Sequence, residues 1–454
     1  MSVISPVDTS TAPTAFAVEH VALPPPPSSS PLRRILKHPR LMHHNRLAAL
    51  VLIANLALLG HALTGGGWWS GDRIDLAAVS AAVLANFALA ILIRQQYVIN
   101  LLFWLATRAP THWPLRIRWT LGKVYHFGGL HVGGALAGTL WFVVLTASIT
   151  LDTLRSAPPV SIGLLVVSYA LLALLAAIVL TARPGYRARQ HDRFERMHRF
   201  GGWTALVLFW TQTVLFVQTG DGSLLAAPQI WVLALLTLSV ALPWLRLRKV
   251  PVAVTRPSNH VAVARFNHGV TPFAGSSTAI SRHPLREWHS FANVPAPGES
   301  GFRLTISRAG DWTGSFIDDM PAHVWVKGIT TAGVANIETL FTKVVYVATG
   351  SGIGPVLPHL LARKVPSRLV WATRSPRATY GDALVDEILA GQPDATVWDT
   401  ATHGKPDMVR LAYAAYAAFG AEAVICISNK KLTWQVVHGL ERRGIPAYGA
   451  IWDS

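Results

Sequence analysis

The sequence predicts a multi-domain membrane protein in which a six-helix, all-α transmembrane domain is followed by a small β-barrel and an α/β domain. Six apolar runs of about 20 residues precede Pro251, and about 20 residues let a helix cross a bilayer. Short alternating patterns with Gly and Pro turns then indicate β-strands. From about Thr342, strand patterns alternate with helix patterns, which favours a parallel sheet. The predicted boundaries are 1–32 for a disordered tail, 33–249 for the transmembrane domain, 250–341 for the barrel and 342–454 for the α/β domain.

The composition agrees with a membrane protein. Of the 454 residues, 51% are apolar and 14% are charged, whereas an average soluble domain has about 25% charged residues. The net charge of +17 has two interpretations, a nucleic-acid partner or positive loops on the cytoplasmic side of a membrane. The single cysteine, Cys426, excludes a disulfide within the chain and fits a reducing compartment.

The N-terminal tail contains PPPPSSSP and little that could pack, so we expect it to be disordered. Its basic residues come after position 30, with the first apolar run later still. A signal peptide has the opposite arrangement, with basic residues at its start, so the tail is not expected to be one.

Positive charge alternates between the loops that join the apolar runs. Lys and Arg cluster before the first run and after the second, fourth and sixth, whereas the other loops carry only Arg73 and Arg155. Short loops rich in Lys and Arg stay in the cytoplasm. We therefore expect an integral, multi-pass protein in contact with membrane lipid, with cytoplasmic N- and C-termini and no nucleic-acid partner. The runs lie at 47–64, 74–93, 121–149, 159–182, 200–219 and 226–245.

A glycine loop opens the α/β domain. Gly350, Gly352 and Gly354 follow a strand pattern and precede a helix pattern that begins near Pro355. Glycines let the backbone approach a pyrophosphate closely, and a helix N-terminus offers free N–H groups to it. A tight turn between strand and helix is the alternative, because one glycine loop alone is weak evidence.

Several motifs in order give the region 250–454 a resemblance to the ferredoxin–NADP reductase superfamily. TGSGIGP resembles its pyridine-nucleotide loop, and AGDWTGS at 309–315 resembles its flavin-phosphate loop. EWHSF at 287–291 stands where the family has its isoalloxazine motif, and GKPD at 404–407 resembles a family turn. The resemblance implies an NAD(P)H-dependent flavin oxidoreductase.

The resemblance also implies a role for each matching residue. In the flavin half, Ser290 would hydrogen-bond the flavin ring, and His289 would stack on it or flank it. In the nucleotide half, Arg374 and Ser375 would meet the ribose, and Tyr380 would lie against the adenine. The remaining matches are Gly310 and Thr313 for the flavin phosphate, Gly350, Gly352 and Gly354 for the nucleotide phosphates, and Trp452 as an aromatic cover for the flavin.

Three features decide which cofactors the resemblance implies. FAD is the flavin that the resemblance implies. Glu287 stands where a positive residue usually meets flavin phosphate, so the diphosphate contact stays open, and with it FMN. CISN at 426–429 replaces the usual Cys-Gly-Pro, and a buried strand residue is one interpretation of Cys426. Arg374 and Arg377 together favour a 2′-phosphate, and hence NADPH over NADH, because guanidinium pairs well with phosphate.

Six spans followed by these domains resemble ferric reductases and NADPH oxidases, and more closely TmpA-like transmembrane flavoproteins. In the oxidase group, histidines of the third and fifth spans hold haem. The resemblance implies His126 and His198 as ligands of one inner haem b. Thr211 and Gln212 stand where an outer histidine would follow His198, so a two-haem path is not expected. The alternative that the transmembrane domain binds no haem, and that these histidines are interfacial polar residues, stays open.

These expectations lead to one main functional hypothesis and two alternatives. The main hypothesis is an enzyme that takes hydride from NAD(P)H and passes electrons through flavin to an unidentified acceptor in or at the inner half of the membrane. The first alternative is a haem-containing transmembrane electron carrier like the ferric reductases. The second is a non-catalytic membrane flavoprotein that senses redox state or scaffolds partners.

Overall fold

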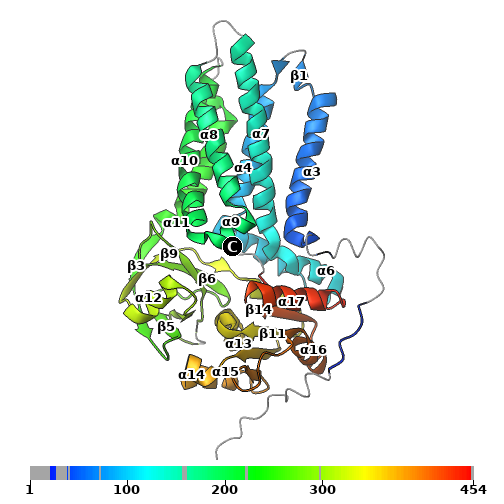
Figure 1. The fold of residues 1–454 in the computed structure, drawn as a ribbon, viewed down its shortest axis with the longest axis vertical. Coiled ribbons are helices and arrows are strands. Elements are labelled where there is room, and N and C mark those ends of the chain that lie inside the picture. The colour runs from blue at the N-terminus through cyan, green and yellow to red at the C-terminus, as the bar shows by residue number, and fades with distance from the viewer. Residues whose placement is uncertain are drawn as a thin grey trace, which may run out of the picture. The chain divides into compact units, whose positions relative to one another are not determined.

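The computed structural model describes residues 21–26, 38, 41–70, 73–155, 161–219, 223–295 and 298–450 (Figure 1). The chain forms two compact units. We call Arg40–Val98 and His126–Leu245 the helical unit, and Met1–Pro39, Ile99–Tyr125 and Arg246–Ser454 the two-lobed unit. The predicted tail lies mostly outside the described residues, as does Trp452.

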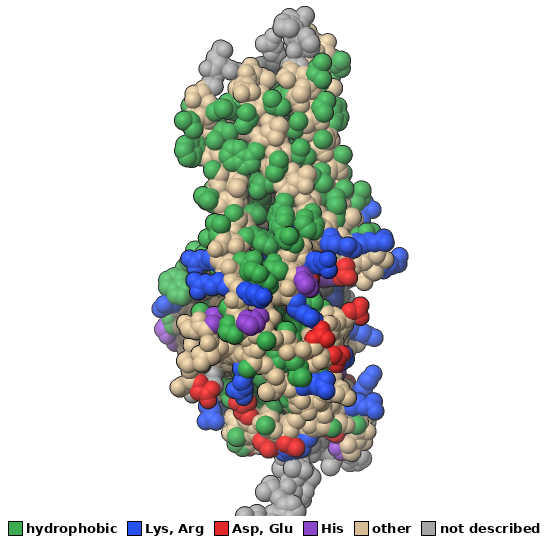
Figure 2. Space-filling view, turned by 90° about the vertical axis from the view of Figure 1, so that its left-hand side faces the viewer, with side chains coloured by type: hydrophobic (Ala, Val, Ile, Leu, Met, Phe, Trp, Pro, Cys, Tyr) green, Lys and Arg blue, Asp and Glu red, His purple; other side chains and the backbone are tan. Residues whose placement is uncertain are grey.

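The helical unit contains the predicted apolar runs as helices. Among the described residues, five helices are long and apolar enough to cross a membrane, or six if the bent pair of α4 (Leu76–Leu92) and α5 (Gln96–Ala106) is one span. Figure 2 shows hydrophobic side chains along their outward surface. The remaining helices are α3 (His43–Thr64), α7 (Gly128–Arg155), α8 (Ile162–Thr181), α9 (Pro184–Arg189), α10 (His191–Gln218) and α11 (Pro228–Leu245).

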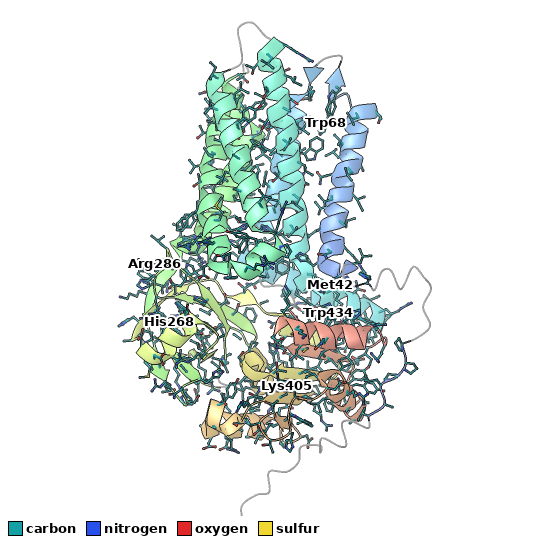
Figure 3. The ribbon with its side chains drawn as sticks, in the orientation of Figure 1. Met42, Trp68, His268, Arg286, Lys405 and Trp434 are labelled. Atoms are coloured by element: carbon teal, nitrogen blue, oxygen red, sulfur yellow. The ribbon has the colours of Figure 1, made fainter. Side chains whose placement is uncertain are left out.

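Small and polar residues allow the helices of this unit to approach closely. A Cβ added to Gly134 of α7 would lie 2.7 Å from the carbonyl oxygen of Asn86 on α4, so a larger side chain would separate these helices. Asn86 and Asn55 of α3 exchange side-chain hydrogen bonds of 2.7 and 3.0 Å, and Trp141 donates to Asn55. Trp68, labelled in Figure 3, packs on Trp141 with ring centroids 5.6 Å apart.

The region predicted as a β-barrel forms two open antiparallel sheets in its described residues, and we call it the flavin lobe after the cofactor that the sequence resemblance implies. One sheet has the order β10-β6-β9-β3 with β7 paired to β6, and the other has the order β4-β5-β8. The prediction of a closed barrel is therefore wrong. The elements are β3 (Leu247–Pro251), β4 (Ala253–Thr255), β5 (Val261–Phe266), β6 (Ser276–Ser281), β7 (His289–Ala292), β8 (Phe302–Ser307), α12 (Asp311–Asp319), β9 (His323–Lys327) and β10 (Thr331–Ala332).

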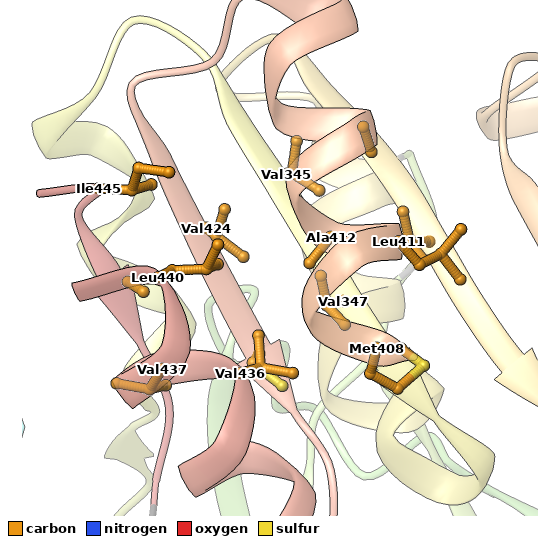
Figure 4. Close-up of a cluster of buried hydrophobic side chains, with 14 of the residues drawn as sticks. Val345, Val347, Met408, Leu411, Ala412, Val424, Val436, Val437, Leu440 and Ile445 are labelled. Carbon is orange, nitrogen blue, oxygen red and sulfur yellow. The ribbon is translucent and has the colours of Figure 1, made fainter. Parts of the chain in front are cut away.

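The nucleotide lobe is the predicted parallel α/β sheet, with strand order β13-β12-β11-β14-β15. Valines on β11 and β14 pack against α16 and α17 in a buried cluster that includes Leu411 and Leu440 (Figure 4). The strands are β11 (Val344–Thr349), β12 (Ser367–Thr373), β13 (Thr396–Asp399), β14 (Ala423–Ile427) and β15 (Ala447–Tyr448). The helices are α13 (Ile353–Ala362), α14 (Pro376–Tyr380), α15 (Asp382–Gly391), α16 (Met408–Phe419) and α17 (Lys430–Glu441).

The segment Ile99–Tyr125 belongs to the two-lobed unit, although the sequence predicted it as a loop of the transmembrane domain. It includes most of α5, helix α6 (Leu115–Leu121) and the start of a 3₁₀ turn at Gly122–Phe127. Its buried Arg118 makes two hydrogen bonds to Glu422 of the nucleotide lobe, at 2.7 and 3.0 Å. Its Asn100 bonds the backbone of the flavin lobe at Thr330 and Ala332. The segment therefore ties both lobes together.

Candidate flavin and nucleotide site

The glycine loop lies between β11 and α13, as predicted. Gly350 has φ +49°, a conformation that favours glycine, and it begins the turn that leads into the helix. A Cβ added to Gly352 would lie 2.0 Å from the carbonyl oxygen of Ile427, so this glycine lets the loop pack against the end of β14. Gly354 lies in the first turn of α13. The three glycines thus shape the loop and its junction with the helix.

The loop stands at the switch point of the parallel sheet. The chain runs from β11 outward to β13 on one side, and β14 starts the other side, so β11 and β14 are the central neighbours. Ligands of such sheets bind in the crevice at the carboxyl ends of the strands where the order reverses. Thr349 at the end of β11 and Ser428 just after β14 join their hydroxyl groups by a hydrogen bond at this place. The carboxyl ends of β11 and β14 thus place two hydroxyl groups beside the glycine turn.

Cys426 lies within β14 and is buried. Its side chain is part of the buried cluster beneath α16 and α17, and burial raises the pKa of its thiol to about 12. The interpretation as a buried strand residue is therefore confirmed. Ser428, two residues on, is the residue at the strand end, and the sequence reasoning missed it because the motif comparison started from the cysteine.

The two predicted phosphate arginines differ in their partners. Arg377 forms ion pairs with Asp382 at 3.0 Å and Asp386 at 2.8 Å. Arg374 is exposed, and no ion pair with it occurs among the described residues. The following Ser375 has φ +42°, and its N–H donates to Asp399 at 2.8 Å. This turn therefore presents Arg374 as its available cation.

Tyr380 lies beneath the loop instead of on its surface. Its side chain is buried, and its ring contacts Trp371 edge to face with centroids 5.1 Å apart. The Trp371 indole donates to the carbonyl oxygen of Gly350 at 3.1 Å. Tyr380 thus supports the glycine loop through Trp371. A buried ring has no open face for a base, so this place differs from the predicted contact with adenine.

His289 and Ser290 are neighbours on β7 and therefore point to opposite faces of the sheet. The His289 ring stacks on Trp312 of α12 with centroids 4.1 Å apart and an angle of 25°. Phe291, on the same face as His289, is also roughly parallel to Trp312. Ser290 is exposed. The strand thus has an aromatic stack on one face and the exposed hydroxyl group of Ser290 on the other.

The predicted flavin-phosphate loop is an open turn before α12. A Cβ added to Gly310 would meet no atom within 4 Å, so the backbone there has room for a ligand. The Thr313 hydroxyl accepts hydrogen bonds from the N–H groups of Ala309 at 2.8 Å and Gly310 at 3.1 Å. Thr313 therefore holds the shape of the turn, and the N-terminus of α12 supplies the N–H groups that suit an anion.

Glu287, which raised doubt about the diphosphate contact, closes the connection between β6 and β7. Its Oε1 accepts hydrogen bonds from the backbone N–H groups of Arg282 and His283, and from the side chains of Ser281 and Trp312. The carboxylate is thus satisfied inside its own loop. Its negative charge is a structural feature of the turn, which the motif comparison could not distinguish from a phosphate-facing position.

A buried polar triad joins the two lobes. Glu338 accepts a hydrogen bond from Tyr346 at 2.5 Å on β11 and lies 2.7 Å from Nδ1 of His359 on α13. All three side chains are almost completely buried. Nε2 of His359 points at Gly275, where a Cβ would lie 2.3 Å away. The triad holds α13, the helix of the glycine loop, against the flavin lobe.

The histidines of the helical unit form two ring pairs. His198 lies edge to face with His131 at 5.9 Å, and His126 stacks on His43 at 5.7 Å. The structure thus gives His198 a contact with His131, whereas the sequence paired it with His126. Within the described ranges, no group of three or more His, Cys, Asp and Glu residues could hold a metal ion.

Comparison with known proteins finds related reductases. Residues 334–454 match the family model described as the C-terminal domain of adenylate-forming reductase 03009. The chain is 43% identical over 431 residues to adenylate-forming reductase 03009 of Coprinopsis cinerea, and 41% identical over 428 residues to adenylate-forming reductase 06235 of the same fungus. Each match covers 93% of this chain and 41% of the relative, so the chain spans about two fifths of these curated relatives. Both are reductases by name, in agreement with the predicted oxidoreductase.

Matches among solved structures cover less of the chain. The ferredoxin NADP+ reductase from Neisseria gonorrhoeae with bound FAD and NADP is 13% identical, with a TM-score of 0.37, over 45% of this chain and 98% of that chain. The ferredoxin reductase in carbazole 1,9a-dioxygenase is 16% identical, with a TM-score of 0.37, over 45% of this chain and 70% of that chain.

Proposed function

We propose that this chain is a membrane-bound, flavin-dependent oxidoreductase that takes hydride from NAD(P)H and delivers electrons to an acceptor in or at the inner half of a membrane. The observation that carries the proposal is the glycine turn at Gly350, which stands at the β11–β14 switch point beside the hydroxyls of Thr349 and Ser428. The same unit carries the open Gly310 turn and the β7 motif.

The nucleotide would be held by backbone and one side chain. The turn at Gly350 and the N-terminus of α13 offer N–H groups to a diphosphate. Exposed Arg374 is the residue we assign to a 2′-phosphate, since Arg377 is already neutralised by two aspartates. This arrangement supports NADPH as the preferred donor, with NADH as the weaker one.

The flavin lobe fits a flavin phosphate through backbone groups. The cations near α12 are already paired: Arg282 with Asp319, and Arg308 with Asp318. We therefore assign the binding of an anion to the backbone N–H groups at the N-terminus of α12, which follow the open turn at Gly310. His289 would flank the ring and Ser290 would hydrogen-bond it. A bound flavin would supply the ability to accept a hydride and to release electrons in single steps. FAD is the flavin that we propose. Identification of the flavin released from the denatured protein distinguishes FAD from FMN.

The membrane part of the proposal rests on the helical unit. Its helices expose large apolar side chains such as Leu56 and Leu140 along candidate spans. The alternation of positive loops supports cytoplasmic N- and C-termini and argues against a nucleic-acid partner. The order of helical unit and two lobes supports the resemblance to TmpA-like flavoproteins, which stays a proposal.

Haem is left out of the proposal. The ring contacts join His198 to His131 and His126 to His43, which gives no support for His126 and His198 as the two ligands of one haem. The names of the curated relatives combine an adenylate-forming step with reduction. This chain matches 41% of each relative, and the reductive step is the one that we propose for it.

An absorption spectrum of the purified full chain, before and after anaerobic NADPH, tests the proposal. We expect a flavin band that bleaches and no Soret band. A bound flavin that neither NADPH nor NADH bleaches would favour the sensor or scaffold alternative, and a Soret band would favour the haem-containing carrier.

Gly310→Val should lose the flavin, because the new side chain fills the open turn. Gly391→Val is the matched control, since a Cβ there also meets no atom within 4 Å and the site is remote in sequence from both loops.

A further inference from the structure

Helix α5 has two faces of different character. Tyr97, Leu101, Trp104 and Leu105 lie within an arc of about 100° at 3.6 residues per turn. These four side chains are each about half exposed, between 46% and 54%. They form one half-exposed apolar stripe, which we call the α5 stripe.

The opposite face of α5 is buried and attached to the flavin lobe. Ile99, Phe103 and Ala106 are each at most 7% exposed. Asn100 donates to the carbonyl oxygen of Thr330 at 2.9 Å and accepts from the N–H of Ala332 at 2.8 Å. Both partners belong to β10 or the turn before it, so α5 is held in place by one face while the α5 stripe stays outward.

We propose that the α5 stripe lies in the lipid headgroup and acyl boundary of the membrane and anchors the flavin lobe to that surface. The proposal rests on the membrane part of the proposed function. It differs from the sequence-based prediction, which made this segment part of a cytoplasmic loop.

Three observations favour lipid as the occupant. The stripe follows α4 after the polar residues Arg94, Gln95 and Gln96, and α5 is bent by 73° from α4, too sharply for the two helices to be one straight span. It combines Tyr and Trp with Leu, as helices at a membrane interface do. Its end carries Arg108, whose guanidinium lies 4.6 Å over the Trp104 ring and so places a cation for lipid phosphates beside the apolar stripe. Exposed Trp113 and Ile117 extend the apolar surface along the same segment.

Spin labels at single cysteines test the position of the stripe in the full chain, reconstituted in lipid nanodiscs. Leu101→Cys reports on the stripe, and Leu105→Cys repeats the measurement on the same face. Leu56→Cys, on a candidate span, is the lipid reference, and Lys405→Cys, on the exposed turn labelled in Figure 3, is the water reference. Native Cys426 is buried with a pKa of about 12, so the unmodified chain serves as the unlabelled blank.

Relative accessibility to oxygen and to a water-soluble nickel chelate gives the outcome. We expect the oxygen-to-nickel ratio at Leu101 and Leu105 to be several-fold above that at Lys405 and below that at Leu56. A ratio equal to that at Lys405, with Leu56 still in lipid, overturns the inference and leaves the proposed function standing. A water-like ratio at Leu56 overturns both. Low access to both reagents, with dipolar broadening between labels, would show that a second copy covers the stripe and also overturns the inference.

Discussion

A single guanidinium decides the nucleotide preference that we propose. Arg377 is neutralised by two aspartates, whereas Arg374 is exposed. Arg374→Gln should raise KM for NADPH about tenfold or more, because a hydrogen bond to a charged group contributes about 1.5–3 kcal/mol, and should leave KM for NADH nearly unchanged. Steady-state kinetics with both nucleotides measures this. Arg377→Gln is the matched control. A larger NADPH-specific effect in that variant would show that Arg377, and not Arg374, binds the 2′-phosphate.

The buried carboxylate of Glu338 depends on its two partners. His359→Leu would leave this group with Tyr346 as its remaining partner in the triad. Removal of one hydrogen-bond partner from a buried polar group costs about 1–3 kcal/mol, so the thermal midpoint should fall. His359→Gln keeps a polar side chain of similar reach and should lose less. Thermal unfolding of the two variants checks this, and equal midpoints for both would show that the contact with Glu338 is unimportant.

At the scale of elements, α6 is attached to the nucleotide lobe by a pH-dependent bond. Hydrogen bonds from Arg118 lower the pKa of Glu422 to about 2, from 4.5 in the absence of such partners. A lowered pKa in the folded state means that this stabilisation is complete above about pH 4.5 and is lost as the pH falls toward 2.

Glu422→Gln should therefore lower the free energy of unfolding at pH 7 by about 1–2 kcal/mol, allowing for partial solvent screening, and should remove this part of the acid dependence. Unfolding of wild type and variant between about pH 7 and pH 3 measures the difference. The two curves should converge as the pH falls. Parallel curves over the whole range would show that the Arg118–Glu422 pair contributes no pH-dependent stability.

At the scale of the whole molecule, long-range patterns were predictable and local partners were not. Apolar runs and the strand–helix alternation predicted the helices and the parallel sheet, because each signal is repeated over many residues. Motif order located the turns at Gly310 and Gly350. Sequence spacing could not show that Tyr380 is buried under Trp371 or that Glu287 is satisfied in its own loop, because these depend on contacts made after folding. The closed barrel failed for the same reason, since strand patterns do not state which edges pair.

The unexpected place of Ile99–Tyr125 gives the last prediction. A fragment beginning at Arg246 has both lobes by sequence, but it lacks Arg118 for Glu422, Lys123 for Glu441 and the backbone of Trp119 for Tyr448. It leaves the carboxylates without these cations and exposes the Tyr448 ring, against which Gly122 packs so closely that a Cβ would lie 2.7 Å away.

We therefore expect this fragment to be unstable alone and to gain several degrees in thermal midpoint when a peptide of residues 99–125 is added, since a ligand that binds only the folded state stabilises it. The same peptide with Arg118→Ala is the matched control and should give a smaller gain, because it cannot pair with Glu422. An isolated fragment that unfolds at the same temperature with and without either peptide would mean that the lobes need no such segment. Stabilisation by the first peptide alone would make this segment, which hydropathy assigns to a loop between spans, an integral part of the unit that carries the proposed flavin and nucleotide sites.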